Sequence, residues 1–354
     1  MALREFWPFE ALPNITGTSL AASPLPFLRN DIGLTVAVGG TTASVLQSDG
    51  TFQMSSTWQN SQTNAAALTI PYGNVSDFTT DKSFIGMRYR NTMGTVTQVS
   101  ALQAAWLTNG SGTVQPLISL PLLTLCPYQY FEIMIDRTNK QIVTWIDNVQ
   151  QPPVAFDFNG FVNGGACTLS LGVRFAVGTI NSSFSSNFRD VYFVDDTQDA
   201  TQCTRLGPVG TVPAPLTSAT APNYVSSDSG TPLSDLSTIL GTTAATQTLP
   251  TLTSPASLDP ITLGVSNTNI NAALPILGVK VDVSASRSGG SGFVLNGAAK
   301  FNGQTVAGKK VQFVTPGQMY YNQNALLAEK APDGTNWTPA SVAAAQFTLT
   351  PAAS

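Results

Sequence analysis

The chain of 354 residues contains no histidine and little charge of either sign. Without histidine, neither a Ser-His-Asp nor a Cys-His catalytic arrangement can form, and the usual nitrogen ligand of zinc is missing. Charged residues make up 10% of the chain, against roughly 25% in an average soluble domain, and the net charge is −4. Because a basic field is lacking, neither nucleic acid nor a membrane surface is expected as a partner.

Cysteine is also scarce. Cys126, Cys167 and Cys203 are too few and too widely spaced for a disulfide framework or a CxxC metal site. No apolar run has the length of a transmembrane helix, and the opening residues MALREFWPFEALP lack the apolar core of a signal peptide. Glycine-rich phosphate-binding motifs are missing. We therefore expect free buried thiols, no cofactor, no metal and synthesis in a cytoplasm.

Uncharged polar residues take the place of charge, with 29 Gly and 23 Pro marking frequent turns. Interspersed charge normally keeps proteins apart, so this composition favours a subunit whose faces are buried in an assembly. A soluble module with a weakly charged coat is the alternative. Residues 1–278 hold 10 basic and 17 acidic side chains, whereas residues 279–354 hold six and three. This split indicates a domain boundary, unless it reflects chance in a small sample.

The clearest structural signal is the stretch from Tyr128 to Val149, YQYFEIMIDRTNKQIVTWIDNV. Apolar residues alternate with polar ones on both sides of the polar segment Arg137–Lys140. A short polar connection between two runs of period two predicts a β-hairpin. Its first strand should place Phe131, Ile133 and Ile135 on one face.

Short runs of the same kind recur between residues 31 and 197, with Gly-Gly, Asp-Gly and Asn-Gly pairs between them. No helical periodicity is sustained over ten residues. This pattern predicts an all-β fold, an antiparallel β-sandwich or jelly roll. The runs are Leu34–Val38, Ala43–Gln47, Ala67–Ile70, Phe84–Tyr89, Val96–Trp106, Thr168–Val177 and Phe188–Val194, with a short helix as the alternative for the Ala-rich end of the fifth.

Three further segments flank this domain. Residues 1–30 are Pro-rich and carry Phe6, Trp7 and Phe9, so they form either an arm that docks on a partner subunit or the first strand of their own sheet. Residues 198–260 are rich in Pro, Ser and Thr and have no basic residue after Arg205, which predicts an extended linker. Residues 261–354 return to strand-like runs and predict a smaller β domain, with one helical turn at Ser341–Gln346.

One pattern could carry chemistry. Glu132 and Asp136 lie on the first strand of the predicted hairpin, and jelly-roll glycosidases of the laminarinase type carry catalytic carboxylates on one strand as E-x-D-x-E. Here Met134 takes the middle position, and four strand residues span roughly 13 Å, too far for the pair to converge. The interpretation favoured is a polar strand face, and no catalytic residue is assigned.

Two other sets are candidates for ligands. Asp195, Asp196 and Asp199 could supply oxygens to calcium, although a solvated strand end is the simpler reading. Trp58, Trp106 and Trp145 could stack on sugar rings, although large aromatic residues in a sandwich usually form the core. Of these, Trp58 and Trp106 are the predicted glycan contacts.

The order of several motifs resembles a group of tailed-bacteriophage structural proteins with a concanavalin A-like (laminin G-like) jelly roll followed by a compact β segment. In that group the hairpin strand ends near Asp-Gly, where this chain has Asn148, and the group's Asp-Thr-Thr-Tyr element is missing or degenerate here. The resemblance covers most of residues 120–350. It rests on the hairpin, the strand Asn187–Asp195, the triplet Asn223-Tyr224-Val225 and the turn Pro332–Pro339 with Trp337 and Thr338.

The resemblance implies a non-enzymatic virion component, made in the host bacterial cytoplasm. Its place would be the tail, baseplate, fibre, collar or head surface, as a homo-oligomer, with a trimer favoured, in contact with other virion proteins. Residues 1–30 and 198–260 would be its docking segments. The alternative is a lectin-like module that recognises a host cell-surface glycan.

Overall fold

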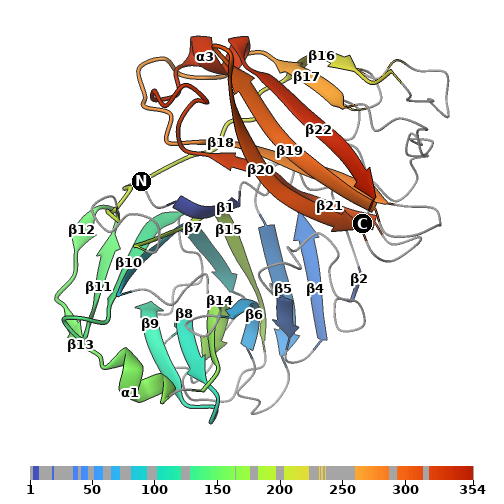
Figure 1. Cartoon of the computed structure of the whole chain (residues 1–354). Coiled ribbons are helices and arrows are strands. Elements are labelled where there is room, and N and C mark those ends of the chain that lie inside the picture. Colours follow the sequence, from blue (N-terminus) through green and yellow to red (C-terminus); the bar gives the residue numbers. More distant parts are fainter. Residues whose placement is uncertain are drawn as a thin grey trace. The chain divides into compact units, whose positions relative to one another are not determined.

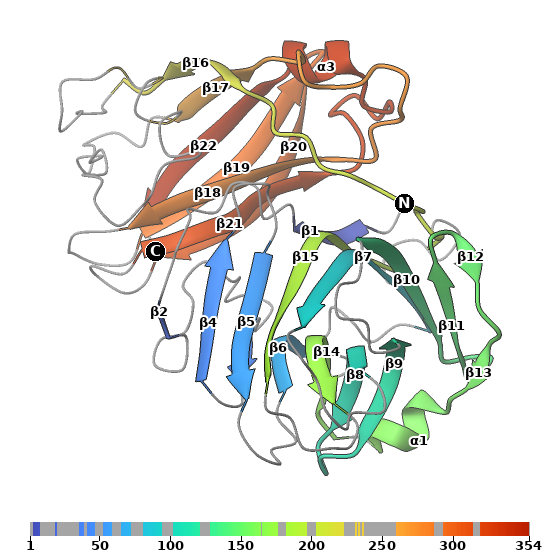
Figure 2. The ribbon, with the colours of Figure 1, turned by 180° about the vertical axis from the view of Figure 1, so that it is seen from behind.

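The computed structural model shows a chain of two compact units made almost wholly of antiparallel strands (Figures 1 and 2). Unit 1 comprises Met1–Glu10, Ile15–Leu25 and Asn30–Thr211, and unit 2 comprises Ala11–Asn14, Pro26–Arg29 and Val212–Ser354. The structure describes residues 3–7, 18–19, 35–38, 41–46, 52–58, 65–71, 81–93, 102–120, 128–163, 165–175, 182–196, 203–222, 231, 233, 236, 260–286, 293–313 and 319–353.

Unit 1 is an antiparallel β-sandwich, which confirms the predicted fold class. Within the described residues its larger sheet has ten strands in the order β12-β11-β10-β7-β15-β5-β4-β2, with β1 also paired to β15 and β13 to β11. These strands are β1 Leu3–Trp7, β2 Thr18–Ser19, β4 Thr41–Leu46, β5 Phe52–Trp58, β7 Lys82–Met93, β10 Gln129–Asp136, β11 Gln141–Ile146, β12 Val149–Gln150, β13 Val154–Ala155 and β15 Ser182–Asp195.

The smaller sheet of unit 1 runs β3-β6-β14-β8-β9 in the described residues. Its strands are β3 Thr35–Val38, β6 Ala65–Pro71, β8 Leu102–Asn109, β9 Val114–Leu120 and β14 Cys167–Phe175. The part of Val96–Trp106 that is described, from Leu102, is strand rather than helix. A short helix that the sequence did not predict, α1 (Phe158–Val162), begins at Asp157, whose carboxylate accepts a hydrogen bond from the Gly160 N–H.

The hairpin predicted at residues 128–149 is confirmed as β10 and β11, joined by residues 137–140. Ile135 lies opposite Ile142, and Phe131 opposite Ile146. Phe131 and Ile133 are fully buried in the core, as period-two alternation requires. β10 pairs on its other side with β7, and β7 pairs in turn with β15. The hairpin therefore lies one strand in from an edge of the larger sheet, with both of its strands partnered on each side.

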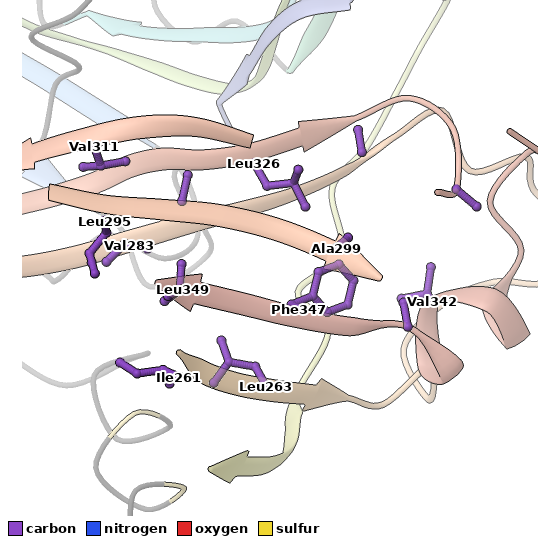
Figure 3. Packing of buried hydrophobic residues seen from close by; sticks show 14 of the residues in the cluster. Ile261, Leu263, Val283, Leu295, Ala299, Val311, Leu326, Val342, Phe347 and Leu349 are labelled. Atoms are coloured by element: carbon purple, nitrogen blue, oxygen red, sulfur yellow. The ribbon is translucent and has the colours of Figure 1, made fainter. Parts of the chain in front are cut away.

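Unit 2 contains a five-stranded sheet, β16-β17-β22-β19-β20, and a two-stranded sheet, β18-β21, in the described residues. Trp337 is buried and donates its indole N–H to the Ala328 carbonyl at 2.9 Å. Figure 3 shows the apolar cluster on these sheets. The elements are β16 Leu216–Thr220, β17 Ile261–Val265, β18 Val279–Ser286, β19 Phe293–Phe301, β20 Gln304–Phe313, β21 Met319–Ala328, α3 Pro339–Ala344 and β22 Gln346–Ala353.

The helical turn predicted at Ser341–Gln346 is α3, which starts two residues earlier. Thr338 and Ser341 form a reciprocal capping box at its start, which satisfies backbone N–H groups that a helix cannot pair internally. No helix in the described part of the chain is long and apolar enough to cross a bilayer.

The described residues place parts of the N-terminal segment and of the predicted linker in the two units. Residues 3–7 form β1, in which Phe6 lies opposite Tyr192 and Trp7 opposite Val191, so this part of the predicted arm is a strand of its own sheet. Within the predicted linker, residues 203–211 belong to unit 1, and residues 216–220 pair with β17 in unit 2. Strand pairing holds residues 3–7 and 216–220, and hydrogen bonds to the buried carboxylates of Glu132 and Asp190 hold residues 203–211. Composition alone reveals neither kind of contact.

Candidate functional site

The carboxylate of Glu132 is the centre of a buried polar cluster in the described part of unit 1. The residue lies on β10, on the face of the strand opposite to Phe131 and Ile133, and it is 0% exposed. Its Oε1 accepts hydrogen bonds from the Tyr192 hydroxyl and, at 3.0 Å, from the Gly207 N–H. Its Oε2 accepts from Nε of Arg205, with which it also forms an ion pair. Both oxygens are therefore engaged by the chain itself.

A glycine makes this geometry possible. Glu132 on β10 and Tyr192 on β15 both lie opposite Gly86 of β7, which runs between those two strands. A Cβ atom built on Gly86 would lie 2.0 Å from Cε1 and 2.4 Å from Cζ of Tyr192. The Tyr192 ring thus lies against the bare backbone of Gly86 and reaches across β7 to the carboxylate. Glycine inside a strand often marks such a close approach.

Two tyrosines extend the cluster. The hydroxyl oxygens of Tyr130 and Tyr192 lie 3.1 Å apart, and the Tyr130 hydroxyl donates to the Gly207 carbonyl. Burial, with the nearby Glu132 charge, raises the pKa of Tyr130 far above its ordinary value. Burial raises the pKa of Tyr192 further still. Both phenols therefore remain protonated at neutral pH and act as hydrogen-bond donors rather than bases.

Residues 203–211, called the strap here, bring Arg205 and Gly207 to this cluster. Besides Glu132, the Arg205 guanidinium contacts the Asn148 side-chain oxygen and lies 5.1 Å from the centre of the Trp145 ring. At the start of the strap, the buried Cys203 thiol donates to the Lys82 carbonyl at 3.5 Å. Burial raises the pKa of Cys203 to about 12, so the thiol stays protonated and unreactive.

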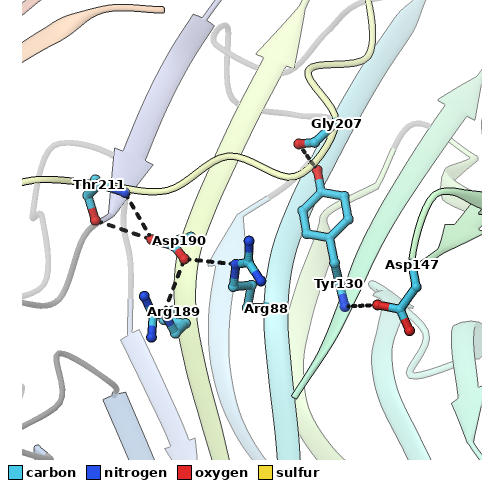
Figure 4. A network of polar contacts seen from close by, with 7 residues as sticks. All are labelled: Arg88, Tyr130, Asp147, Arg189, Asp190, Gly207 and Thr211. Carbon is cyan, nitrogen blue, oxygen red and sulfur yellow. Dashed lines mark hydrogen bonds and ion pairs between the residues drawn. The ribbon is translucent and has the colours of Figure 1, made fainter. Parts of the chain in front are cut away.

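A second carboxylate holds the other end of the strap. Asp190 lies at a bulge of β15, has a positive φ of 53° and is 1% exposed. Its Oδ1 accepts from the N–H and the hydroxyl of Thr211, both at 3.2 Å. Its Oδ2 lies 3.2 Å from Nε of Arg88 and 3.1 Å from Nε of Arg189 (Figure 4). The strap is thus fixed at two buried acids, one on β10 and one on β15.

Asp136, the other carboxylate of the strand pattern, has partners of its own. It accepts hydrogen bonds from the backbone and side chain of Asn139, at 2.9 and 2.8 Å, and lies 3.9 Å from the Lys82 amine. Burial by itself would raise the pKa of Asp136, but the two Asn139 hydrogen bonds, the Lys82 charge and a backbone hydrogen bond from Thr138 together hold that pKa below its usual value. Asp136 therefore shapes the hairpin loop, and it shares no partner with Glu132 among these contacts.

The structure does not assemble the other predicted ligand residues into a site. Trp106 is 3% exposed, so its ring is not available to a sugar, and the Trp58 side chain lies outside the described residues. Asp195 is buried, and Asp196 accepts a hydrogen bond from the Lys82 N–H at 2.9 Å. Asp199 and Phe9 lie outside the described residues. In the part of the chain that the structure describes, no three His, Cys, Asp or Glu residues are placed to hold a metal.

The fold and the buried polar cluster define an all-β protein. In its antiparallel sandwich, the strap covers the Glu132 carboxylate. No protein-family model matches the chain, and no curated protein matches it. Among solved structures, it is similar to a sialidase, at 8% identity and a TM-score of 0.30, over 53% of this chain and 19% of that one.

Two further similar structures are alginate lyase A1-II', a member of polysaccharide lyase family-7, and botulinum neurotoxin type C. For the lyase, identity is 10% and the TM-score 0.30, over 43% of this chain and 82% of the other. The neurotoxin's cell entry depends on interaction with two ganglioside molecules; identity is 9% and the TM-score 0.32, over 46% and 43%. The chain thus spans less than half the length of the sialidase and neurotoxin chains, and no site residue is transferred from any of the three.

The strap carries a prediction about the boundary of unit 1. Ending the chain at Thr197, the domain boundary predicted from the sequence, removes Arg205 and Thr211 and leaves two buried carboxylates, Glu132 and Asp190, short of partners. A chain ending after Thr211 keeps both. We expect the longer chain to unfold cooperatively in urea and the shorter one to lose at least about 3 kcal/mol or to fail to fold. If the urea unfolding curves of the two chains had equal midpoints and equal slopes, the strap would not stabilise unit 1.

Proposed function

We propose that this chain is a non-enzymatic structural subunit of a tailed-phage particle, assembled as a homo-oligomer. The observation that carries the proposal is the closed cluster around Glu132. A catalytic carboxylate must present an oxygen to its substrate, whereas both oxygens of Glu132 are engaged by Tyr192, Arg205 and Gly207. The same cluster suits a structural protein, because it holds the strap, at the end of unit 1, against β10.

An exposed edge of the larger sheet supports assembly. β12 and β13 both pair with β11, and Val149 and Val154 on them are 65% and 54% exposed. Natural sheet edges are usually protected by charged side chains, yet the segment NVQQPPVA, residues 148–155, carries none. The two prolines limit strand addition, so a second copy of the chain would contact this edge mainly through side chains.

The phage particle is supported by the sequence resemblance and by the low charge of the chain. A subunit whose surfaces are covered by copies of itself needs little charge to stay soluble. Among the possible oligomers, the resemblance favours a trimer.

Native mass tests the assembly. We expect light scattering on the purified chain to give a trimer or larger, and Val149→Lys or Val154→Lys to lower that mass. Ser119→Lys is the matched control, because Ser119 is exposed on β9, at the edge of the smaller sheet, and receives the same charge. The control should leave the mass unchanged.

A monomer at every concentration tested would contradict the proposal. In that case a glycan array would examine the lectin-like alternative. Any hydrolysis of a polysaccharide that Glu132→Gln abolishes without unfolding the chain would contradict the non-enzymatic assignment directly.

A further inference from the structure

Unit 2 contains an amine, a carboxylate and a carboxamide gathered in a nearly buried place. Lys280 and Asp282 lie on β18, and their side chains are 10% and 11% exposed, with Lys280 Nζ 3.1 Å from Asp282 Oδ1. Asn324 lies on β21 and is 4% exposed. By comparison, Lys82 and Lys140, in their ion pairs with Asp136 and Asp157, have side chains that are 40% and 63% exposed. A lysine withdrawn from water to this extent is unusual.

The strand register brings the three side chains to one face. Lys280 and Asp282 are two residues apart on β18 and therefore point the same way, opposite to Val281 and Val283, which pack on the apolar cluster. Asp282 lies directly opposite Asn324 on β21. Cβ atoms of residues directly opposite in a sheet are about 4.5–5.5 Å apart. The Lys280 amine contacts Asp282, and Asp282 lies opposite Asn324, so the register places the three side chains on one face of the two-stranded sheet.

The backbone at Asn324 is fixed by its neighbour. Ala325 is the extra residue at a register shift between β18 and β21, and it is fully buried. Cβ atoms built on Gly297 and Gly308 would lie 2.3 and 1.9 Å from the Ala325 carbonyl oxygen. The two glycines thus receive that carbonyl in direct backbone contact. This contact prevents β21 from sliding and holds Asn324 in place.

We propose that Lys280 and Asn324 become joined by an intramolecular isopeptide bond, with Asp282 carrying the proton. In a nearly buried site, the proton of the ammonium can pass to the carboxylate, because burial disfavours both charged forms. The neutral Nζ attacks Cγ of Asn324 and forms the new C–N bond. The bond from Cγ to Nδ2 breaks as Asp282 gives its proton to the leaving nitrogen, Asp282 then takes the second proton from Nζ to leave a neutral amide, and one ammonia is released. No oxidant or cofactor is consumed.

The arrangement of the three side chains in the folded unit favours the reaction. Reacting groups that a folded chain holds together react as if at very high concentration, and water, the competing nucleophile, is largely excluded here. The product would tie β18 to β21 covalently, closing a loop that contains all of β19 and β20. Closing a long loop restricts the unfolded chain and so stabilises the folded unit. The proposal stands on the cluster alone and does not depend on the proposed function.

The intact mass of the full, folded chain tests it. We expect the wild-type mass to fall below the mass calculated from the sequence by one ammonia, and a protease digest to give a branched peptide joining Lys280 to Asn324. Lys280→Arg keeps a cation beside Asp282 but cannot form the bond, so its mass should equal the calculated value. Asn324→Ala should do the same, and Asp282→Ala should greatly slow formation of the bond.

Lys330→Arg is the matched control. The Lys330 amine donates to the Asn336 side-chain oxygen at an exposed site, and the structure places no carboxylate in contact with that amine. This variant should keep the loss of ammonia. Circular dichroism confirms that each variant is folded before its mass is interpreted. A folded wild-type chain of full calculated mass, or a loss of ammonia that persists in Lys280→Arg, would overturn the proposal.

Discussion

Replacing Arg205 with methionine is expected to destabilise unit 1 by about 3 kcal/mol, because it leaves the buried Glu132 carboxylate without its cation. Removing one partner of a fully buried ion pair costs about 3–5 kcal/mol, and the lower end applies since the Arg205 side chain is 28% exposed. Urea unfolding followed by fluorescence measures the change. Faster labelling of Cys203, detected by peptide mass, should report that the strap has loosened.

Two variants sharpen this measurement. Glu132→Gln combined with Arg205→Met removes the buried charge itself and should recover part of the lost free energy of unfolding. Lys140→Met breaks the exposed 2.8 Å ion pair with Asp157 and should change stability much less than Arg205→Met, because water screens the pair. If Arg205→Met cost no more than Lys140→Met, the buried pair would not be what holds the strap.

Gly86→Ala is expected to destabilise unit 1 by about 3–5 kcal/mol. The new methyl group would occupy the space of the Tyr192 ring, which is fully buried and has no solvent to move into. Displacing the ring also breaks its hydrogen bond to Glu132. Overpacking a core costs about 1–3 kcal/mol, and losing a buried hydrogen bond to a charged group costs a similar amount. The midpoint of urea unfolding measures the effect.

Gly210→Ala provides the control, since a Cβ atom there meets nothing within 4 Å, and it should leave stability nearly unchanged. A double variant, Gly86→Ala with Tyr192→Ala, should cost less than the sum of the two single changes, because the collision disappears with the ring. Simple additivity would mean that the ring and the methyl group do not compete for the same space.

Much of the architecture follows from the sequence because it depends on neighbours along the chain. The alternation in β10 and β11 and the polar loop between them are local properties, and they predicted the hairpin with its faces correctly. The helical turn at α3 was predicted within two residues, and its start is fixed by Thr338 and Ser341, three residues apart. Recurring short runs with glycine turns were enough to establish an all-β sandwich.

The role of Glu132 could not be determined in this way. Nothing in the stretch from Glu132 to Asp136 shows whether the first carboxylate is open or engaged, because its partners lie 60 to 75 residues further along the chain. Two signals were present but ambiguous: Gly86 within a strand pattern, and Arg205 as the last base before a long base-free stretch. Each has a meaning only once β7 is known to run between β10 and β15.

The sequence by itself thus determined the strands, their turns and the class of fold, since these are set by periodicity and by turn chemistry within a few residues. The tertiary structure alone decided the strand order, the pairing of Phe6 and Trp7 with β15, and the closure of Glu132 by the strap. The physical reason is that pairing between distant strands depends on which faces are buried together, and one strand's sequence does not specify its neighbour.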